Sequence, residues 1–115
     1  MNNTAFDHDT TISITVVDRE DHLHQIEAPC DLNLNLMEIL KIYQFPVEGT
    51  CGGMALCASC HIYVLSEHTL KDRSADEEDM LDQAFFVDEN SRLACQIIIA
   101  KSLDQLKIKL APVQQ

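Results

Sequence analysis

The sequence predicts a small α+β domain, and two observations carry that prediction. Short segments with alternating apolar residues occur near both ends of the chain, whereas two central segments show helical periodicity. These segments do not follow the regular strand–helix–strand order of a doubly wound parallel sheet. At 115 residues, 46% of them hydrophobic, the chain has the length of one domain with its own core. We place this domain at residues 11–112, after a flexible N-terminus at 1–10 and before a short tail at 113–115.

Four segments are predicted strands. TISITVV, from Thr11 to Val17, alternates and is rich in β-branched residues. HLHQIEA, which begins at His22, alternates again after the charged turn DRED, so the two segments predict an opening β-hairpin. HIYVL, from His61, and DQLKIKL, from Asp104, complete the set.

The first predicted helix lies in NLNLMEILKIYQFP, residues 33–46. Its apolar positions fall at i, i+3, i+4 and i+7 and share one helical face: Leu36, Ile39, Leu40 and Tyr43. Asn33 or Asn35 can cap the first turn, since both side chains accept hydrogen bonds from exposed backbone amides. Pro46 prevents continuation of the helix.

The second predicted helix lies in SADEEDMLDQAFF, residues 74–86, and opens with the capping-box pattern Ser74-x-x-Glu77. One side of this helix is apolar: Met80, Leu81, Ala84 and Phe85. The segment also carries the densest group of acidic residues in the chain: Asp76, Glu77, Glu78, Asp79 and Asp82. From the residues alone, this group is a solvated helix face whose first members stabilise the positive end of the helix dipole.

The charge balance limits the classes of partner. A net charge of −11 disfavours nucleic acid and anionic membranes and favours a soluble monomer that binds a basic protein surface. No apolar run approaches the roughly 20 residues that cross a bilayer, and the N-terminal residues show no signal or transit pattern. We therefore expect a cytoplasmic protein, or a mitochondrial matrix protein only if a transit peptide has been removed.

Three of the five cysteines lie in CGGMALCASCHIYV, residues 51–64. The complete set is Cys30, Cys51, Cys57, Cys60 and Cys95. The last four give the spacing Cys-x5-Cys-x2-Cys-x34-Cys, which can surround a tetrahedral metal or a small iron–sulfur cluster. An odd number of cysteines in a cytoplasmic protein argues against a disulfide framework.

Three other interpretations of these cysteines compete with a cluster. Incidental buried cysteines would explain any one of them, but not four at this spacing. A Cys-x-x-Cys redox pair usually opens a helix, whereas Cys57 and Cys60 precede a strand-like run. Structural zinc usually needs two knuckles of similar shape, and the chain has one. Gly52 and Gly53 permit close backbone approach, and small residues such as Ser59 leave room for a larger cofactor. The loop therefore favours an iron–sulfur cluster, while a zinc-stabilised binding module without a redox role stays open as the alternative.

At these residues the sequence resembles the 2Fe-2S ferredoxins of the adrenodoxin and putidaredoxin type. The resemblance rests on the cysteine spacing, on His61 directly after the third cysteine, on DEEDMLD in the acidic segment and on SRLACQI around Cys95. It extends from about Thr11 to Pro112. It implies a β-grasp-like fold, with a mixed sheet, a main helix and a short acidic helix.

The resemblance also implies which residues hold the cofactor, one 2Fe-2S cluster. The implied ligands are Cys51, Cys57, Cys60 and Cys95, whereas Cys30 matches no ligand position. Cys51 and Cys57 would hold the iron nearer the surface, with the electron leaving near the Gly52–Leu56 arc. The implied supporting residues of the cluster loop are Gly52, Gly53, Ser59 and His61.

The family resemblance gives the acidic helix a docking role. The implied docking residues are Asp76, Glu77, Glu78, Asp79 and Asp82, of which Asp79 and Asp82 align best. Arg92 is expected to form a structural ion pair. The implied function is that of an electron carrier and not of an enzyme. It would take electrons from a basic-faced, NAD(P)H-dependent flavoprotein ferredoxin reductase. The acceptor would be a haem-thiolate (cytochrome P450-type) monooxygenase or the iron–sulfur cluster assembly machinery.

Overall fold

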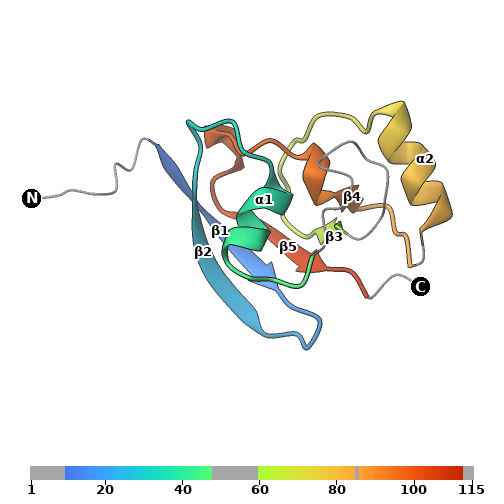
Figure 1. The fold of residues 1–115 in the computed structure, drawn as a ribbon, viewed down its shortest axis with the longest axis horizontal. Coiled ribbons are helices and arrows are strands. Elements are labelled where there is room, and N and C mark those ends of the chain that lie inside the picture. Colours follow the sequence, from blue (N-terminus) through green and yellow to red (C-terminus); the bar gives the residue numbers. More distant parts are fainter. Residues whose placement is uncertain (1–9, 48–59, 85, 113–115) are drawn as a thin grey trace, which may run out of the picture.

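A computed structural model shows a mixed five-stranded sheet and two helices (Figure 1). It describes residues 10–47, 60–84 and 86–112. The strands lie in the order β2-β1-β5-β3-β4, which confirms the predicted α+β class. Their bounds are β1 Thr11–Val17, β2 Leu23–Pro29, β3 His61–Val64, β4 Ser91–Leu93 and β5 Leu106–Leu110.

The pairing of the strands follows from their sequence patterns. β1 and β2 form the predicted antiparallel hairpin, with Ile14 opposite Ile26. β5 pairs in parallel with β1 and antiparallel with β3, so the two ends of the domain meet at the centre of the sheet. The alternation in β1 and β5 is reflected in burial, since every second side chain of β5 is buried.

The helix α1, Leu36–Ile42, covers one face of the sheet. Asn35 caps it in a full capping box, because Asn35 Oδ1 accepts from the Glu38 amide and Glu38 Oε1 accepts from the Asn35 amide, both at 2.9 Å. The prediction for Tyr43 was wrong. Tyr43 is the C-terminal cap and is 44% exposed, and its hydroxyl bonds the backbone of Glu27 on β2.

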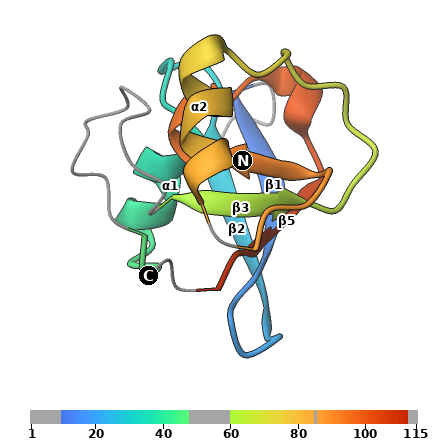
Figure 2. The same ribbon diagram turned by 90° about the vertical axis from the view of Figure 1, so that its right-hand side faces the viewer.

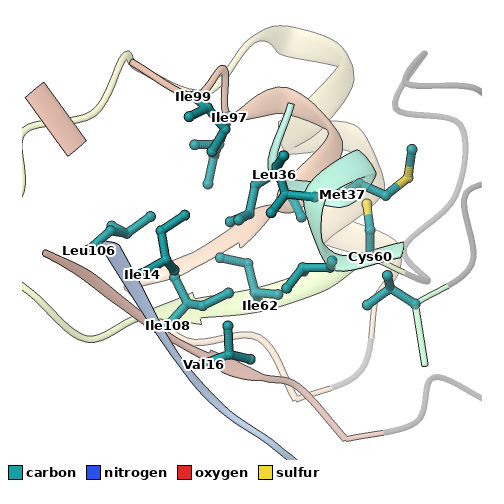
Figure 3. Close-up of a cluster of buried hydrophobic side chains, with 14 of the residues drawn as sticks. Ile14, Val16, Leu36, Met37, Cys60, Ile62, Ile97, Ile99, Leu106 and Ile108 are labelled. Carbon is teal, nitrogen blue, oxygen red and sulfur yellow. The ribbon is translucent and has the colours of Figure 1, made fainter. Parts of the chain in front are cut away.

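The core lies between α1 and the sheet (Figure 3). Its largest fully buried side chains include aliphatic residues of β1, α1, β3 and β5: Ile14, Leu36, Ile62, Leu106 and Ile108. Cys60 and Cys95 belong to the same buried cluster. The two cysteines are therefore held by the core and not by a surface loop alone.

The acidic helix α2, Ala75–Gln83, lies at the end of the molecule away from β2, next to β4 (Figures 1 and 2). Ser74 caps it, as predicted, by accepting a hydrogen bond from the Glu77 amide at 3.2 Å. A full capping box also needs a hydrogen bond from the backbone amide of Ser74 to the Glu77 side chain. That contact is replaced, because the Glu77 carboxylate accepts hydrogen bonds from β4 instead.

Strand β4 and two 3₁₀ turns, η1 Ala94–Gln96 and η2 Lys101–Leu103, were not predicted. β4 is three residues long and buries all of them, two of which are polar, so no alternating pattern marks it. Among the described residues, no helix is long and apolar enough to span a membrane.

Candidate metal centre

The register of β3 and β4 brings two of the four predicted ligands together. His61 pairs with Leu93 across the two antiparallel strands. The Ala94 amide then donates to the Cys60 carbonyl at 2.9 Å, one residue before Cys95. Both side chains are buried, with 0% exposure for Cys60 and 4% for Cys95. The fold thus brings together two cysteines that are 35 positions apart in the sequence.

The surroundings of these two cysteines suit a thiolate-bound group. The Gln96 side-chain amide donates to Cys95 Sγ at 3.5 Å, a contact that stabilises negative charge on sulfur. Cys51, Cys57, Gly52, Gly53 and Ser59 lie outside the described residues, so the predictions for them stay predictions.

Cys30 is placed away from this pair. It follows Pro29, which pairs with Thr11 at the beginning of β1. Cys60 adjoins His61, whose carbonyl accepts from the Ala111 amide just beyond the end of β5. Because β1 and β5 are parallel, the register puts Cys30 and Cys60 at opposite ends of the sheet. This placement agrees with the omission of Cys30 from the predicted ligand set.

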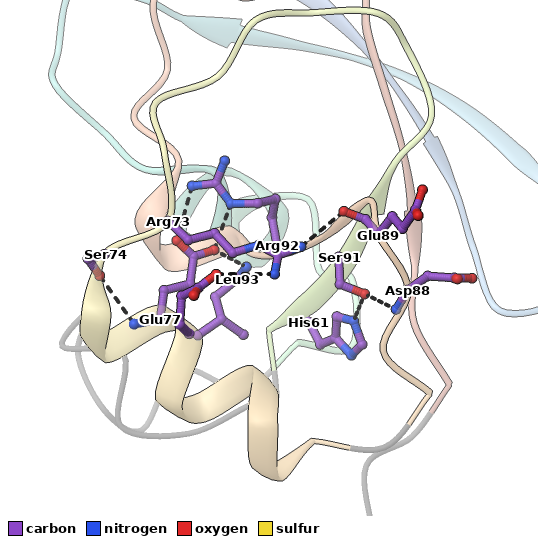
Figure 4. A network of polar contacts seen from close by, with 10 residues as sticks. His61, Arg73, Ser74, Glu77, Asp88, Glu89, Ser91, Arg92 and Leu93 are labelled. Carbon is purple, nitrogen blue, oxygen red and sulfur yellow. Dashed lines mark hydrogen bonds and ion pairs between the residues drawn. The ribbon is translucent and has the colours of Figure 1, made fainter.

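A buried carboxylate joins the acidic helix to the strand that leads to Cys95 (Figure 4). Glu77 is fully buried, and Arg92 on β4 is 8% exposed. Arg92 Nε donates to Glu77 Oε2 at 2.8 Å and Arg92 Nη2 donates to Oε1 at 3.0 Å. The Leu93 amide adds a third contact, to Oε2 at 2.9 Å. The predicted role of Arg92 as a structural ion-pair former is confirmed.

The burial of Glu77 contradicts its predicted role as a docking residue. Glu77 presents no surface to a partner, because both of its carboxylate oxygens accept hydrogen bonds inside the protein. The other four are exposed: Asp76, Glu78, Asp79 and Asp82. A sequence signal for this difference exists, since Glu77 lies four residues before the buried Leu81, on the apolar face of the helix.

His61 links β3 to β4 from within the core. Its Nε2 lies 2.7 Å from Ser91 Oγ, and the same oxygen accepts from the Asp88 amide at 2.8 Å. Burial, followed by the positive charge of Arg73, lowers the pKa of His61 and favours the neutral imidazole. Within the described residues, the buried Nδ1 has no hydrogen-bond partner. An unsatisfied buried ring nitrogen, in the residue that follows Cys60 in the sequence, fits a position that faces an additional group. The predicted support of the cluster loop by His61 stays a prediction.

A second group of metal-binding residue types lies in the turn between β1 and β2. Ligand atoms of Asp18, Glu20 and His22 lie within 4.8 Å of one another. The Asp18 carboxylate already has local partners, because Oδ1 accepts from the amides of Glu20 and His22 and Oδ2 contacts His24 Nε2 at 2.8 Å. The His24 hydrogen bond is the main cause that lowers the pKa of Asp18 to about 2. The Asp18 carboxylate therefore caps the turn.

Comparison with known proteins decides the family. Residues 17–100 match the family model described as the 2Fe-2S iron-sulfur cluster binding domain. The chain belongs to the 2Fe-2S ferredoxin family. It is 38% identical over 101 residues to a 2Fe-2S ferredoxin of Rickettsia prowazekii, covering 86% of this chain and 88% of that protein. This family is an electron-carrier family whose domain binds one 2Fe-2S cluster, so the zinc-module alternative is not retained.

The solved structures place this ferredoxin in the adrenodoxin and putidaredoxin type. A ferredoxin from Rhodopseudomonas palustris HaA2 superposes with a TM-score of 0.82 at 32% identity, covering 90% of this chain and 99% of that one. A reduced putidaredoxin variant from Pseudomonas putida gives 0.80 at 28% identity, with the same coverages. These neighbours confirm the predicted β-grasp type of α+β fold.

Replacement of Glu77 tests whether its burial holds in solution. We expect Glu77→Gln to lower the free energy of unfolding by about 3–5 kcal/mol, because it leaves the Arg92 guanidinium buried without its anion. Urea unfolding followed by circular dichroism measures the effect. The exposed Asp79→Asn removes the same charge from the same helix and should leave the unfolding free energy at the wild-type value.

A matched double variant shows how much of the lost stability comes from leaving Arg92 unpaired and how much from the loss of the Glu77 side chain itself. Glu77→Gln combined with Arg92→Met should recover part of the lost stability, since no buried charge then stays unpaired. If Glu77→Gln is as stable as Asp79→Asn, Glu77 is open to solvent and the docking role returns to it.

Proposed function

We propose that this ferredoxin carries single electrons from an NAD(P)H-dependent flavoprotein ferredoxin reductase to a downstream redox partner. The observation that carries the proposal is the buried contact of Glu77 with Arg92 and Leu93. It attaches the acidic helix to the strand that ends two residues before Cys95. The charged helix and the strand that leads to Cys95 are thereby joined by a buried contact.

The proposed ligands are the four cysteines of the sequence pattern: Cys51, Cys57, Cys60 and Cys95. Burial of Cys60 and Cys95, together with the Gln96 hydrogen bond to Cys95, supports this set. When bound, the cluster stores one electron at a time. The chain contributes thiolate ligands, a core that excludes water from two of them and a surface for transient contacts.

Cysteine replacements test the ligand set. Cys60→Ser should abolish or strongly alter the visible absorbance of the purified protein, because serine replaces a soft thiolate with a hard hydroxyl. Cys30→Ser should leave the spectrum intact, since the fold places Cys30 at the other end of the sheet. Loss of colour in Cys30→Ser, with colour retained in Cys60→Ser, would refute the assignment.

The proposed docking surface consists of the four exposed carboxylates of the acidic helix: Asp76, Glu78, Asp79 and Asp82. Arg73 lies 3.5 Å from Glu78, so Asp79 and Asp82 are the more suitable of these for a basic partner. Among the solved structures similar to this chain is putidaredoxin in a covalent complex with putidaredoxin reductase, at 26% identity and a TM-score of 0.77. That complex supports a ferredoxin reductase as a partner of this chain.

Neutralising the helix tests the docking surface. Asp79→Asn with Asp82→Asn should slow reduction by putidaredoxin reductase about tenfold at low salt, because steering of the encounter is lost. Stopped-flow absorbance at rising salt measures the rate, and the difference should shrink as screening grows. The control pair Glu20→Gln with Asp31→Asn removes two exposed charges elsewhere and should react like the wild type. Equal rates for both pairs at low salt would show the helix to be solvated surface only.

Two acceptors are supported by different neighbours. A haem-thiolate monooxygenase is the acceptor that the resemblance to the putidaredoxin type implies, and a putidaredoxin variant is among the similar solved structures. An ISC-like 2Fe-2S ferredoxin from Pseudomonas putida, with a TM-score of 0.77 at 27% identity, supports iron–sulfur cluster assembly. Reduced protein offered to each acceptor in turn decides between them.

We further propose that the protein is a monomer and works in the bacterial cytoplasm. The net charge of −11 supports a monomer. The bacterial relatives support a bacterial cytoplasm, and the mitochondrial adrenodoxin-like protein 1 of Drosophila melanogaster, 32% identical over 104 residues, supports the mitochondrial matrix as the alternative.

A further inference from the structure

The segment that leaves the acidic helix holds an exposed aromatic side chain in an unfavourable backbone conformation. Phe86 is 59% exposed and has φ of 66°, and Val87 beside it is 41% exposed. Positive φ is rare for a bulky residue, because its Cβ crowds the backbone, and glycine is the residue that adopts it without penalty. Neither burial nor backbone preference accounts for a phenylalanine at this position.

The backbone around Phe86 is fixed on the side of β3. The Tyr63 hydroxyl donates to the Phe86 carbonyl at 2.5 Å, and burial raises the pKa of Tyr63, which keeps this donor protonated. Further along, Ser91 accepts from the Asp88 amide, and the Asn90 side chain donates to the Val64 carbonyl at 2.9 Å. The strained conformation is therefore imposed by its neighbours and presents Phe86 in a defined position.

Acidic residues flank this apolar pair in the sequence. Asp82 precedes it on the helix, and Asp88 and Glu89 follow it, all three exposed. An aromatic anchor inside a charged rim is the usual composition of a protein interface. A second copy of this chain is a poor occupant, since a two-fold contact would place these carboxylates against one another.

We propose that Phe86, with Val87 beside it, is the apolar anchor through which the flavoprotein reductase binds. The fitting partner surface is a shallow apolar pocket rimmed by lysine and arginine. This inference rests on the proposed function: the carboxylates of α2 steer the encounter, and Phe86 retains the complex once it has formed. Removal of the Phe86 side chain should then weaken the bound complex, whereas removal of the carboxylates should slow its association.

Two substitutions at one position separate a docking role from a packing role. Phe86→Gly and Phe86→Ala should keep the visible spectrum of the holoprotein, and Phe86→Gly should raise the midpoint of thermal unfolding because glycine accepts φ of 66°. With putidaredoxin reductase and reduced nicotinamide cofactor, both variants should raise the KM for the ferredoxin about tenfold. The slope of the rate against salt should stay at the wild-type value, since no charge is removed.

The control is Leu23→Ala, which removes a side chain of similar exposure, 65%, from β2 at the other edge of the sheet. It should show the wild-type KM. A wild-type KM in both Phe86 variants would overturn the proposed anchoring role of Phe86, whether or not the midpoint of thermal unfolding is lower. If the wild-type protein itself accepts no electrons from the reductase, the proposed reductase partner fails, and this inference fails with it.

Discussion

The buried carboxylate of Glu77 is the constraint on which the arrangement of the functional surface depends. A charge inside a protein is tolerated only when it is paired and hydrogen-bonded, and Glu77 meets this condition with one arginine and one backbone amide on β4. Its three contacts set the rotation of α2 about its own axis. Once that rotation is set, Asp79 and Asp82 face the solvent as a consequence of the helical repeat.

The same contact connects the charged surface to the cofactor side of the molecule. Leu93, which donates to Glu77, pairs with His61 on β3, and these two strands lead to Cys95 and Cys60. The connection from α2 back to β4 passes through the segment that presents Phe86. The residues proposed for steering, anchoring and cluster binding thus lie on or next to β3 and β4, at one edge of the sheet.

Periodicity was sufficient for most of the helices and strands, and the spacing of the cysteines indicated a thiolate-bound group. The β-grasp fold and the 2Fe-2S cluster were implied by the resemblance to the ferredoxin family. The alternation of β1 and β5 and the cysteine spacing are local patterns, so they can be read without tertiary information. Strand β4 could not be predicted, because Ser91 and Arg92 are buried only through partners distant in the sequence. For the same reason Glu77 was placed among the docking residues. Tyr43 does not share the buried face of α1 as predicted. The helix ends one residue before it, and its hydroxyl donates a hydrogen bond to β2.

The most direct test of this account is a map of the surface that meets the reductase. Amide spectra of the isotope-labelled, oxidised ferredoxin should be recorded during a titration with putidaredoxin reductase. We expect the largest changes in α2 and in residues 86–89, with little change in β2, because the proposed charged and apolar contacts lie near β4, at the opposite edge of the sheet from β2. Changes centred on Leu23–Pro29, with α2 unaffected, would contradict it.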